Sequence, residues 1–248
     1  MAILTLMYHK TPPTQTNDGW SVSLPSFRQQ IDILRNQGFE FIRLSDVTNE
    51  HYYSRRTYIC ITFDDGHKSN LEAFALLRER RIVPTAFIVR QWAQPNSEFM
   101  SAADLSSIGD WCEFGGHGMT HCDLTKLSQR ELRDELTVSK TFLEDACGKT
   151  VTTMSVPGGR INARVVQAAL QCGYRLIGNS VPLVNHRPRK TMNRIAIRSH
   201  DSPQKIALLA NAGVLYWMRQ RMRTSAQRMA LHILGERRYK TFRGIISG

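Results

Sequence analysis

The chain has 248 residues, 42% of them hydrophobic, which suffices for a substantial core in one large domain or in a domain with an appendage. Its longest apolar runs, at residues 58–63 and 84–89, fall far short of the roughly 20 residues that a bilayer-spanning helix requires, so we expect no such helix. The formal charge of +12 is uneven, because residues 212–248 hold eight Lys/Arg and one Glu and so account for +7. A strongly basic balance ordinarily indicates nucleic acid, a membrane surface or an anionic glycan as partner.

Short apolar segments rich in β-branched or aromatic residues recur along the chain and predict strands. The first, within residues 1–9, lacks the basic leader and small-residue cleavage site of a signal peptide, so we expect a strand there and a cytoplasmic protein. The predicted strands cover residues 3–8, 41–44, 58–63, 84–89, 111–114, 151–156, 175–178 and 195–198.

Helical patterns lie between these strands. Phe27, Ile31 and Leu34 share one helical face, and Gly38 is placed to cap that helix. A Ser128–Glu131 capping box predicts a long helix that ends near Gly148, and a further helix is predicted over residues 163–172. The alternation favours a parallel sheet covered by helices, as a barrel or a doubly wound sheet.

Two remaining features concern loops and thiols. Residues 179–190 are polar and contain proline, which predicts a long loop. The five cysteines are an odd number without a CxxC pair, so we expect reduced, packed thiols.

The strongest chemical signal follows the strand predicted at residues 58–63, where Asp64, Asp65 and Gly66 come next. The carboxyl ends of parallel strands form the ligand-binding edge of a sheet. Adjacent carboxylates repel each other unless a cation lies between them or one keeps its proton, and either arrangement separates a ligand from an acid or base. A polar turn would also explain Asp-Asp-Gly.

A second signal is the histidine pair His117 and His121, which follows the strand predicted at residues 111–114. Two imidazoles four residues apart can converge on one ion, and three protein ligands with open positions are typical of a hydrolytic metal site. This spacing alone is common by chance. Its occurrence in the same alternating architecture as the Asp-Asp pair gives it weight.

A third signal is the turn Pro157-Gly158-Gly159-Arg160 after the strand predicted at residues 151–156. Glycines allow backbone amides to approach a ligand, as the stabilisation of a developing oxyanion requires. By itself the turn could be an ordinary connection between a strand and a helix.

In order and spacing, the TFDDG segment at residues 62–66, the HxxxH segment and the PxG segment resemble the polysaccharide deacetylase (NodB-homology) family over roughly residues 1–200. Met7-Tyr8-His9 also resembles the start of the bacterial branch associated with exopolysaccharide and glycan assembly. The resemblance implies an α/β fold, a distorted, incomplete (β/α) barrel of about seven strands. We assign this barrel to residues 1–211, followed by a basic, partly amphipathic helical tail at residues 212–248.

The resemblance also implies a reaction, in which metal-activated water attacks the acyl carbonyl of an N-acetylated or similarly acylated sugar, in a polysaccharide or a lipid-linked glycan. Asp64 would be the base, and Asp65, His117 and His121 would bind one divalent ion, zinc before cobalt or nickel. The backbone amide of Gly158 would hold the oxyanion. The residues assigned to substrate binding are Pro157, Gly159, Arg160 and His9.

Three departures from the family pattern stand out. Gly118 replaces a Ser or Thr common in the family, so a hydrogen bond that stabilises the loop is expected to be missing. Ser155 replaces an arginine that orients the base, and Arg160 is the nearest substitute in the sequence. The late histidine motif is unrecognisable, so His200 is predicted as the general acid, with His9 and His186 as alternatives.

The missing arginine and the unrecognised acid keep a second hypothesis open, a catalytically degenerate glycan-binding or scaffold protein of the same fold. The tail mixes Trp217, Met218 and Met222 with several arginines. We expect a helix packed on the domain with its cationic side exposed, and as the alternative a peripheral contact with an anionic membrane. No nucleic-acid module is recognisable, so no nucleic-acid partner is expected.

Overall fold

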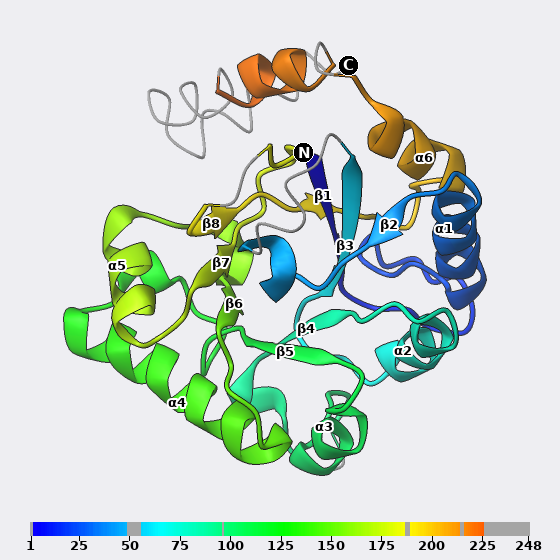
Figure 1. The fold of residues 1–248 in the computed structure, drawn as a ribbon. Helices are drawn as coiled ribbons and strands as arrows, with labels where there is room; N and C mark the ends of the chain where they lie inside the picture. Colours follow the sequence, from blue (N-terminus) through cyan, green and yellow to red (C-terminus); the bar gives the residue numbers. More distant parts are fainter. Residues whose placement is uncertain (1, 49–55, 96, 187–188, 214–215, 226–248) are drawn as a thin grey trace.

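The computed structural model describes residues 2–48, 56–95, 97–186, 189–213 and 216–225 (Figure 1). A nine-stranded sheet has the order β8-β7-β6-β5-β4-β3-β1-β9, with β2 beside β3, and every pairing is parallel. The strands are β1 (Ala2–Tyr8), β2 (Glu40–Phe41), β3 (Thr57–Phe63), β4 (Thr85–Ile88), β5 (Glu113–Gly116), β6 (Thr153–Ser155), β7 (Leu176–Gly178), β8 (Thr191–Met192) and β9 (Ile195–Ala196).

Helices α1 to α6 surround the sheet (Figure 1). They are α1 (Leu24–Asn36), α2 (Asn70–Glu79), α3 (Ala102–Ile108), α4 (Gln129–Cys147), α5 (Ala163–Gln171) and α6 (Pro203–Asn211). Among the described residues no pairing joins β8 to β9, so the barrel is open. The predicted α/β fold, an incomplete (β/α) barrel, is confirmed.

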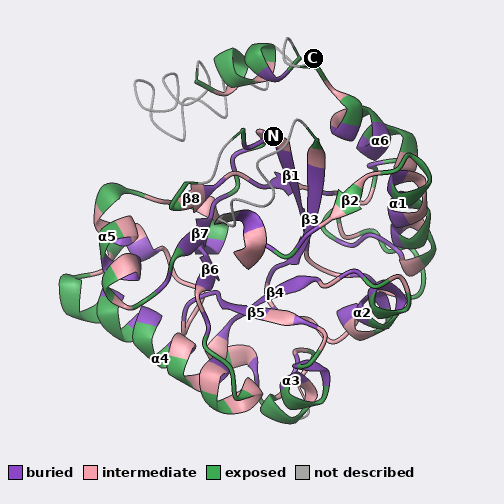
Figure 2. Ribbon diagram, viewed as in Figure 1, coloured by how far each residue is buried: buried purple, intermediate pink, exposed green. Residues whose placement is uncertain are grey.

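The central strands β1 and β3 pair along their whole length, from Ala2 with Thr57 to Tyr8 with Phe63. Each has a buried side chain at six of its seven positions, because both faces are covered (Figure 2). This double burial explains why both strands appear in the sequence as continuous apolar runs. The backbone N–H of Asp64 donates to the carbonyl of Tyr8 at 2.9 Å, which fixes the residues that follow the two strands side by side.

The helix ends agree with the predicted caps. Ser128 and Glu131 form a reciprocal capping box at the start of α4, and Gly148 closes this helix in the left-handed conformation. At the end of α1, Gly38 has a φ of 78° and donates its N–H to the carbonyl of Arg35 at 2.9 Å. These local signals depend only on neighbouring residues, so the sequence predicts them well.

Some strand predictions differ from the structure. The strand predicted at residues 111–114 begins two residues later as β5, and of residues 41–44 only Phe41 lies in a strand. The two-residue strand β8 was not predicted, because two residues are too few for a periodic pattern. The predicted loop at 179–190 contains no named strand or helix among its described residues.

At the C-terminal end, residues 216–225 are helical and Trp217 is 6% exposed within the main hydrophobic core. The rest of the predicted tail, residues 226–248, lies outside the described residues, and the division after residue 211 stays a prediction. All five cysteines are free. No described helix is both long and apolar enough to cross a membrane.

Candidate active site

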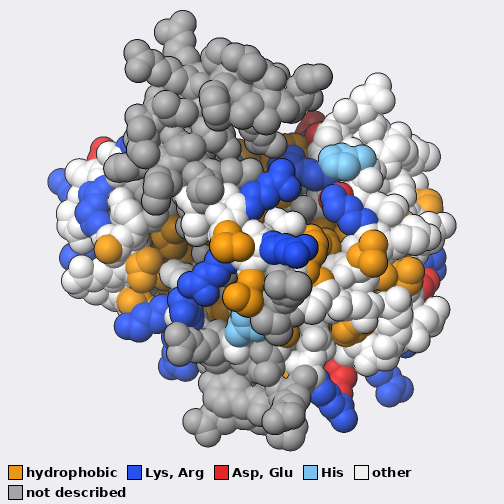
Figure 3. Space-filling model, turned by 90° about the horizontal axis from the view of Figure 1, so that it is seen from above, with side chains coloured by type: hydrophobic (Ala, Val, Ile, Leu, Met, Phe, Trp, Pro, Cys, Tyr) orange, Lys and Arg blue, Asp and Glu red, His pale blue; other side chains and the backbone are white. Residues whose placement is uncertain are grey.

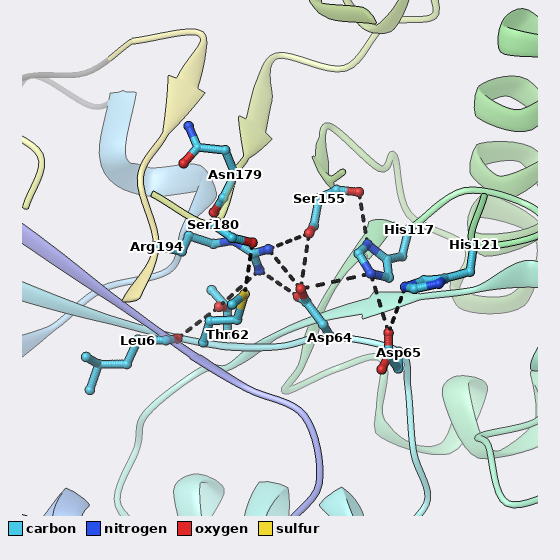
Figure 4. A network of polar contacts seen from close by, with 11 residues as sticks. Leu6, Thr62, Asp64, Asp65, His117, His121, Ser155, Asn179, Ser180 and Arg194 are labelled. Atoms are coloured by element: carbon cyan, nitrogen blue, oxygen red, sulfur yellow. Dashed lines mark hydrogen bonds and ion pairs between the residues drawn. The ribbon is translucent and has the colours of Figure 1, made fainter. Parts of the chain in front are cut away.

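The three sequence motifs meet at the carboxyl ends of β3, β5 and β6 (Figure 4). Asp64 and Asp65 directly follow β3, His117 directly follows β5, and Ser155 is the last residue of β6. The N–H of His117 donates to the carbonyl of Ile88 at 3.0 Å, so β4 also fixes this histidine. The parallel sheet therefore gathers residues that are 91 positions apart in the sequence.

Asp65, His117 and His121 form a compact set of side chains that could hold a metal ion. Asp65 Oδ1 lies 3.4 Å from Nε2 of His117 and 3.4 Å from Nε2 of His121, and the three donor atoms lie within 4.8 Å of one another. Asp65 Oδ1 is buried, and no hydrogen bond of normal geometry from the described residues reaches it. A buried carboxylate oxygen that faces two imidazole nitrogens without a hydrogen bond fits a divalent ion.

The backbone is strained at two of these three residues. Asp65 has a φ of 73° and His121 a φ of 63°, in the left-handed region that residues other than glycine rarely adopt. Each such conformation costs on the order of 1–3 kcal/mol and is typical of functional sites. The strain supports a site in which the direction of the side chain matters more than local stability.

His117 is oriented by a carbonyl behind it. Its Nδ1 lies 3.0 Å from the backbone oxygen of Ser155, so Nδ1 carries the proton and donates it there. This tautomer leaves the Nε2 lone pair facing Asp65. Burial alone would lower the pKa of His117, but the carboxylates of Asp64 and Asp65 outweigh burial and raise it.

Asp64 is held by Arg194, a residue that the sequence analysis did not select. The two terminal nitrogens of Arg194 lie 2.6 Å from Oδ1 and 2.8 Å from Oδ2 of Asp64, a bidentate ion pair. Arg194 lies between β8 and β9, is fully buried, and places its guanidinium 5.0 Å from the ring centre of Phe87. Burial alone would raise the pKa of Asp64, but Arg194 holds it well below its usual range.

Ser155 completes this ion pair. It accepts a hydrogen bond of 2.5 Å from Arg194, and its hydroxyl lies 3.3 Å from Asp64 Oδ2 (Figure 4). The prediction that Arg160 replaces the family arginine is wrong, because Arg160 is about half exposed and pairs with Asp123 at 3.0 Å. The sequence feature that could have identified Arg194 is its position directly before the strand predicted at residues 195–198.

The loop that carries the histidines is held by Glu135 of α4. The buried carboxylate accepts hydrogen bonds from Met119 N at 2.6 Å, Thr120 N at 3.1 Å and Thr120 Oγ1 at 2.6 Å. Gly118 has a φ of 79°, and a β-carbon there would lie 2.9 Å from Glu135 Oε2. We expected that Gly118 would leave the loop without a stabilising hydrogen bond, and the structure corrects this expectation. Glycine at position 118 leaves room for the Glu135 carboxylate, which accepts three hydrogen bonds from the loop.

The Pro157-Gly158-Gly159 turn packs against the same loop. Pro157 is buried, and a β-carbon at Gly118 would lie 3.7 Å from its Cγ. Gly158 has a φ of 61°, and Gly159 packs so closely on Ser180 that a β-carbon would lie 2.5 Å from Ser180 Cβ. The role of the Gly158 amide stays a prediction.

The structure separates the three candidate acids. Burial lowers the pKa of His9, and the nearby carboxylates of Asp64 and Asp65 raise it by a smaller amount. His9 Nδ1 is buried without a hydrogen-bond partner among the described residues, and the His9 ring lies 4.2 Å from Trp20. His200 is 73% exposed and lies 3.8 Å from Asp201.

His186 is exposed and lines a cavity beside the opposite end of β1. Of the three, only His9 is both partly buried and close to the charged groups of Asp64 and Asp65, whereas His200 and His186 are exposed.

Removal of Arg194 tests the buried ion pair. Arg194→Met leaves a buried carboxylate without its partner, so the free energy of unfolding should fall by about 3–5 kcal/mol in urea titrations. Arg160→Met is the matched control, because an exposed pair contributes about 1 kcal/mol or less. Equal effects of the two substitutions would contradict a special role for Arg194.

Removal of Glu135 tests the loop. Without its carboxylate the loop loses three hydrogen bonds, so Glu135→Ala should weaken metal binding by about 10–100-fold in calorimetric titrations of the metal-free protein. Asp134→Asn, at the preceding exposed position of α4, should leave the affinity unchanged. Unchanged affinity in the Glu135 variant would show that the loop needs no such support.

The family model described as polysaccharide deacetylase matches residues 52–177. The chain is 27% identical over 159 residues to a bifunctional xylanase/xylan deacetylase of Cellvibrio japonicus, and covers 23% of that protein with 58% of its own length. It is 22% identical over 178 residues to the putative polysaccharide deacetylase YxkH of Bacillus subtilis, and covers 62% of that protein with 69% of its own length. The chain thus spans less than two thirds of either relative.

Solved structures share the fold. The Streptococcus pyogenes deacetylase PplD has a TM-score of 0.76 at 20% identity, over 85% of this chain and 98% of that one. IcaB of Ammonifex degensii has a TM-score of 0.72 at 20% identity, over 85% and 97%. The family model covers half of the chain and includes the Asp-Asp and HxxxH motifs described above, so the chain belongs to the polysaccharide deacetylase family.

Proposed function

We propose that this protein is a metal-dependent hydrolase that removes N-acetyl or related acyl groups from a carbohydrate. The observation that carries the proposal is the buried Oδ1 of Asp65, which has no hydrogen bond of normal geometry among the described residues and lies 3.4 Å from two imidazole nitrogens, with a second carboxylate beside it. Asp64 Oδ2 lies 3.9 Å from Nε2 of His117. A hydrolytic site of this family needs this combination of a ligand set with an adjacent base.

Asp65, His117 and His121 would hold the ion, which we take to be zinc, with cobalt or nickel as alternatives. When bound, such an ion lowers the pKa of a coordinated water toward neutrality and polarises an acyl carbonyl. The strained backbone at Asp65 and His121 and the Ser155 carbonyl behind His117 direct the three donor atoms toward one point.

Asp64 would accept the proton of the attacking water. Arg194 occupies both carboxylate oxygens from one side and keeps the group ionised. The same pairing lowers the pKa of Asp64, so the carboxylate is a weaker base than a free one. We infer that the main contribution of Asp64 is its fixed orientation toward the reacting water. Correct positioning of a catalytic group lowers the reaction barrier more than a higher basicity would.

His9 would protonate the leaving sugar nitrogen. An amide anion leaves poorly, so a proton must reach the nitrogen as the bond breaks. His9 follows β1, the neighbour of β3, and therefore stands beside Asp64. Its unpartnered Nδ1 is the atom that we assign to this transfer, and the Gly158 amide would stabilise the oxyanion.

The alternative of a degenerate glycan-binding protein rested on a missing arginine and an unrecognised general acid. Arg194 makes the contacts to Asp64, and we assign the acid to His9. These compensations favour an enzyme, because a protein without turnover has no need of an oriented base.

The substrate class is inferred from the family and from the names of the relatives, which concern polysaccharides and xylan. We propose an N-acetylated glycan, in line with the exopolysaccharide branch that Met7-Tyr8-His9 resembles. We further propose that the protein acts in the cytoplasm, on a polysaccharide or a lipid-linked intermediate.

Asp64→Asn tests the base. The amide cannot accept a proton, so acetate release from N-acetylated oligosaccharides should fall by about 10²–10⁴-fold. Bound zinc, measured by elemental analysis, should stay near one per chain because Asp64 is not assigned as a ligand. Removal of the ion by a chelator should abolish activity in the wild type, and added divalent metal should restore it. Acetate release that survives metal removal would contradict the mechanism.

His9→Gln and His200→Gln separate the two candidate acids. Glutamine has similar polarity but cannot deliver a proton, so kcat should fall by about 10²-fold or more at position 9. At position 200, in an exposed side chain, kcat should change by less than about twofold. The opposite ranking would return the acid to His200.

A further inference from the structure

The last described helix has an exposed face that is both apolar and cationic. Residues 216–225 form this helix, and Trp217 anchors it in the core. Met218 and Met222, one helical turn apart, are 58% and 66% exposed, and Arg219 is exposed beside them. Methionines at i and i+4 share a face, so the helix presents to solvent apolar side chains that are flanked by positive charge.

The segment that carries this helix has no acidic residue to balance these arginines. Residues 202–225 contain four Lys/Arg and no Asp or Glu. On the neighbouring α6, Leu208 is 72% exposed. Figure 3 looks down on this end of the molecule and shows Lys and Arg side chains interspersed with hydrophobic ones.

A cavity of about 560 Å³ opens beside the helix. Its apolar wall includes Val184, Trp217 and Met218, and its cationic groups include Arg189 and Arg221. Among the described residues, neither guanidinium pairs with a carboxylate. An apolar wall with two unpaired guanidinium groups suits a phosphate attached to an aliphatic molecule.

The cavity lies at the opposite end of the barrel from the metal-ligating residues. Asn185 lines the cavity and exchanges backbone hydrogen bonds of 2.7 and 3.0 Å with Ile3, near the start of β1. Asp64 instead hydrogen bonds to Tyr8, at the end of the same strand. Five residues of a strand span roughly 16 Å, so the two places are separate.

We propose that this end of the molecule docks on an anionic lipid bilayer. Arg189 and Arg221 would bind a headgroup phosphate in the cavity, and Met218 and Met222 would enter the headgroup layer. The exposed methionines favour a bilayer over nucleic acid, which would satisfy the arginines and leave the methionines in water. In this orientation the bilayer does not cover the active site, which lies at the other end of β1.

The test is co-sedimentation of the full chain with phosphatidylcholine vesicles that contain or lack phosphatidylglycerol. The wild type should bind only the anionic vesicles, and high salt should weaken binding. Arg189→Glu with Arg221→Glu should weaken binding by about 25-fold or more, because each basic side chain near anionic headgroups contributes about fivefold. Arg130→Glu with Arg133→Glu, on exposed positions of α4, is the matched control and should weaken it far less.

A second variant separates insertion from attraction by charge alone. Met218→Ser with Met222→Ser should reduce binding to anionic vesicles while the salt dependence stays the same. Release of acetate from a soluble oligosaccharide should be unchanged in all these variants. Equal binding to neutral vesicles, equal losses in the control pair, no loss in the methionine variant, or tighter binding to DNA than to vesicles would each overturn the proposal.

Discussion

The buried ion pair between Arg194 and Asp64 is the interaction on which the proposed chemistry depends. Both side chains are almost completely removed from water, where an isolated carboxylate would keep its proton. The bidentate guanidinium keeps it ionised and fixes its plane. Arg194 comes from the segment between β8 and β9, whereas the candidate metal ligands follow β3 and β5. The site is therefore complete only when the last strands have joined the sheet.

Each group of the site is held by a partner from a different element. The Ser155 carbonyl at the end of β6 orients His117, and Glu135 on α4 holds the loop that leads to His121. Such partners orient metal ligands, and their loss typically costs about 10–100-fold in metal affinity or activity. The departures at Ser155 and Gly118 are thus exchanges, in which a residue distant in the sequence performs the task of the side chain that is missing. This pattern is what a retained function, rather than a decayed site, would leave behind.

The sequence predicted the parts of the structure that depend on local pattern. Strands β1 and β3 are buried on both faces and therefore form continuous apolar runs, and the Asp-Asp and HxxxH motifs stand at strand ends where a parallel sheet gathers ligands. Arg194 could not be found in this way, because its contact with Asp64 spans 130 residues. His9 and His200 both follow strands of the sheet, and they differ only in three dimensions, where His9 is partly buried with a buried Nδ1 and His200 is 73% exposed. Glu135 was visible only as a charged residue on the apolar face of a helix.

The central claim is that Asp65, His117 and His121 surround one divalent ion beside an oriented base. Anomalous diffraction at the zinc edge from crystals grown with zinc tests it most directly. We predict one strong peak about 2 Å from Asp65 Oδ1 and from Nε2 of both histidines, with Asp64 still paired to Arg194 and outside the ligand set. No peak at this position, or a peak whose ligands exclude either histidine, would contradict the account.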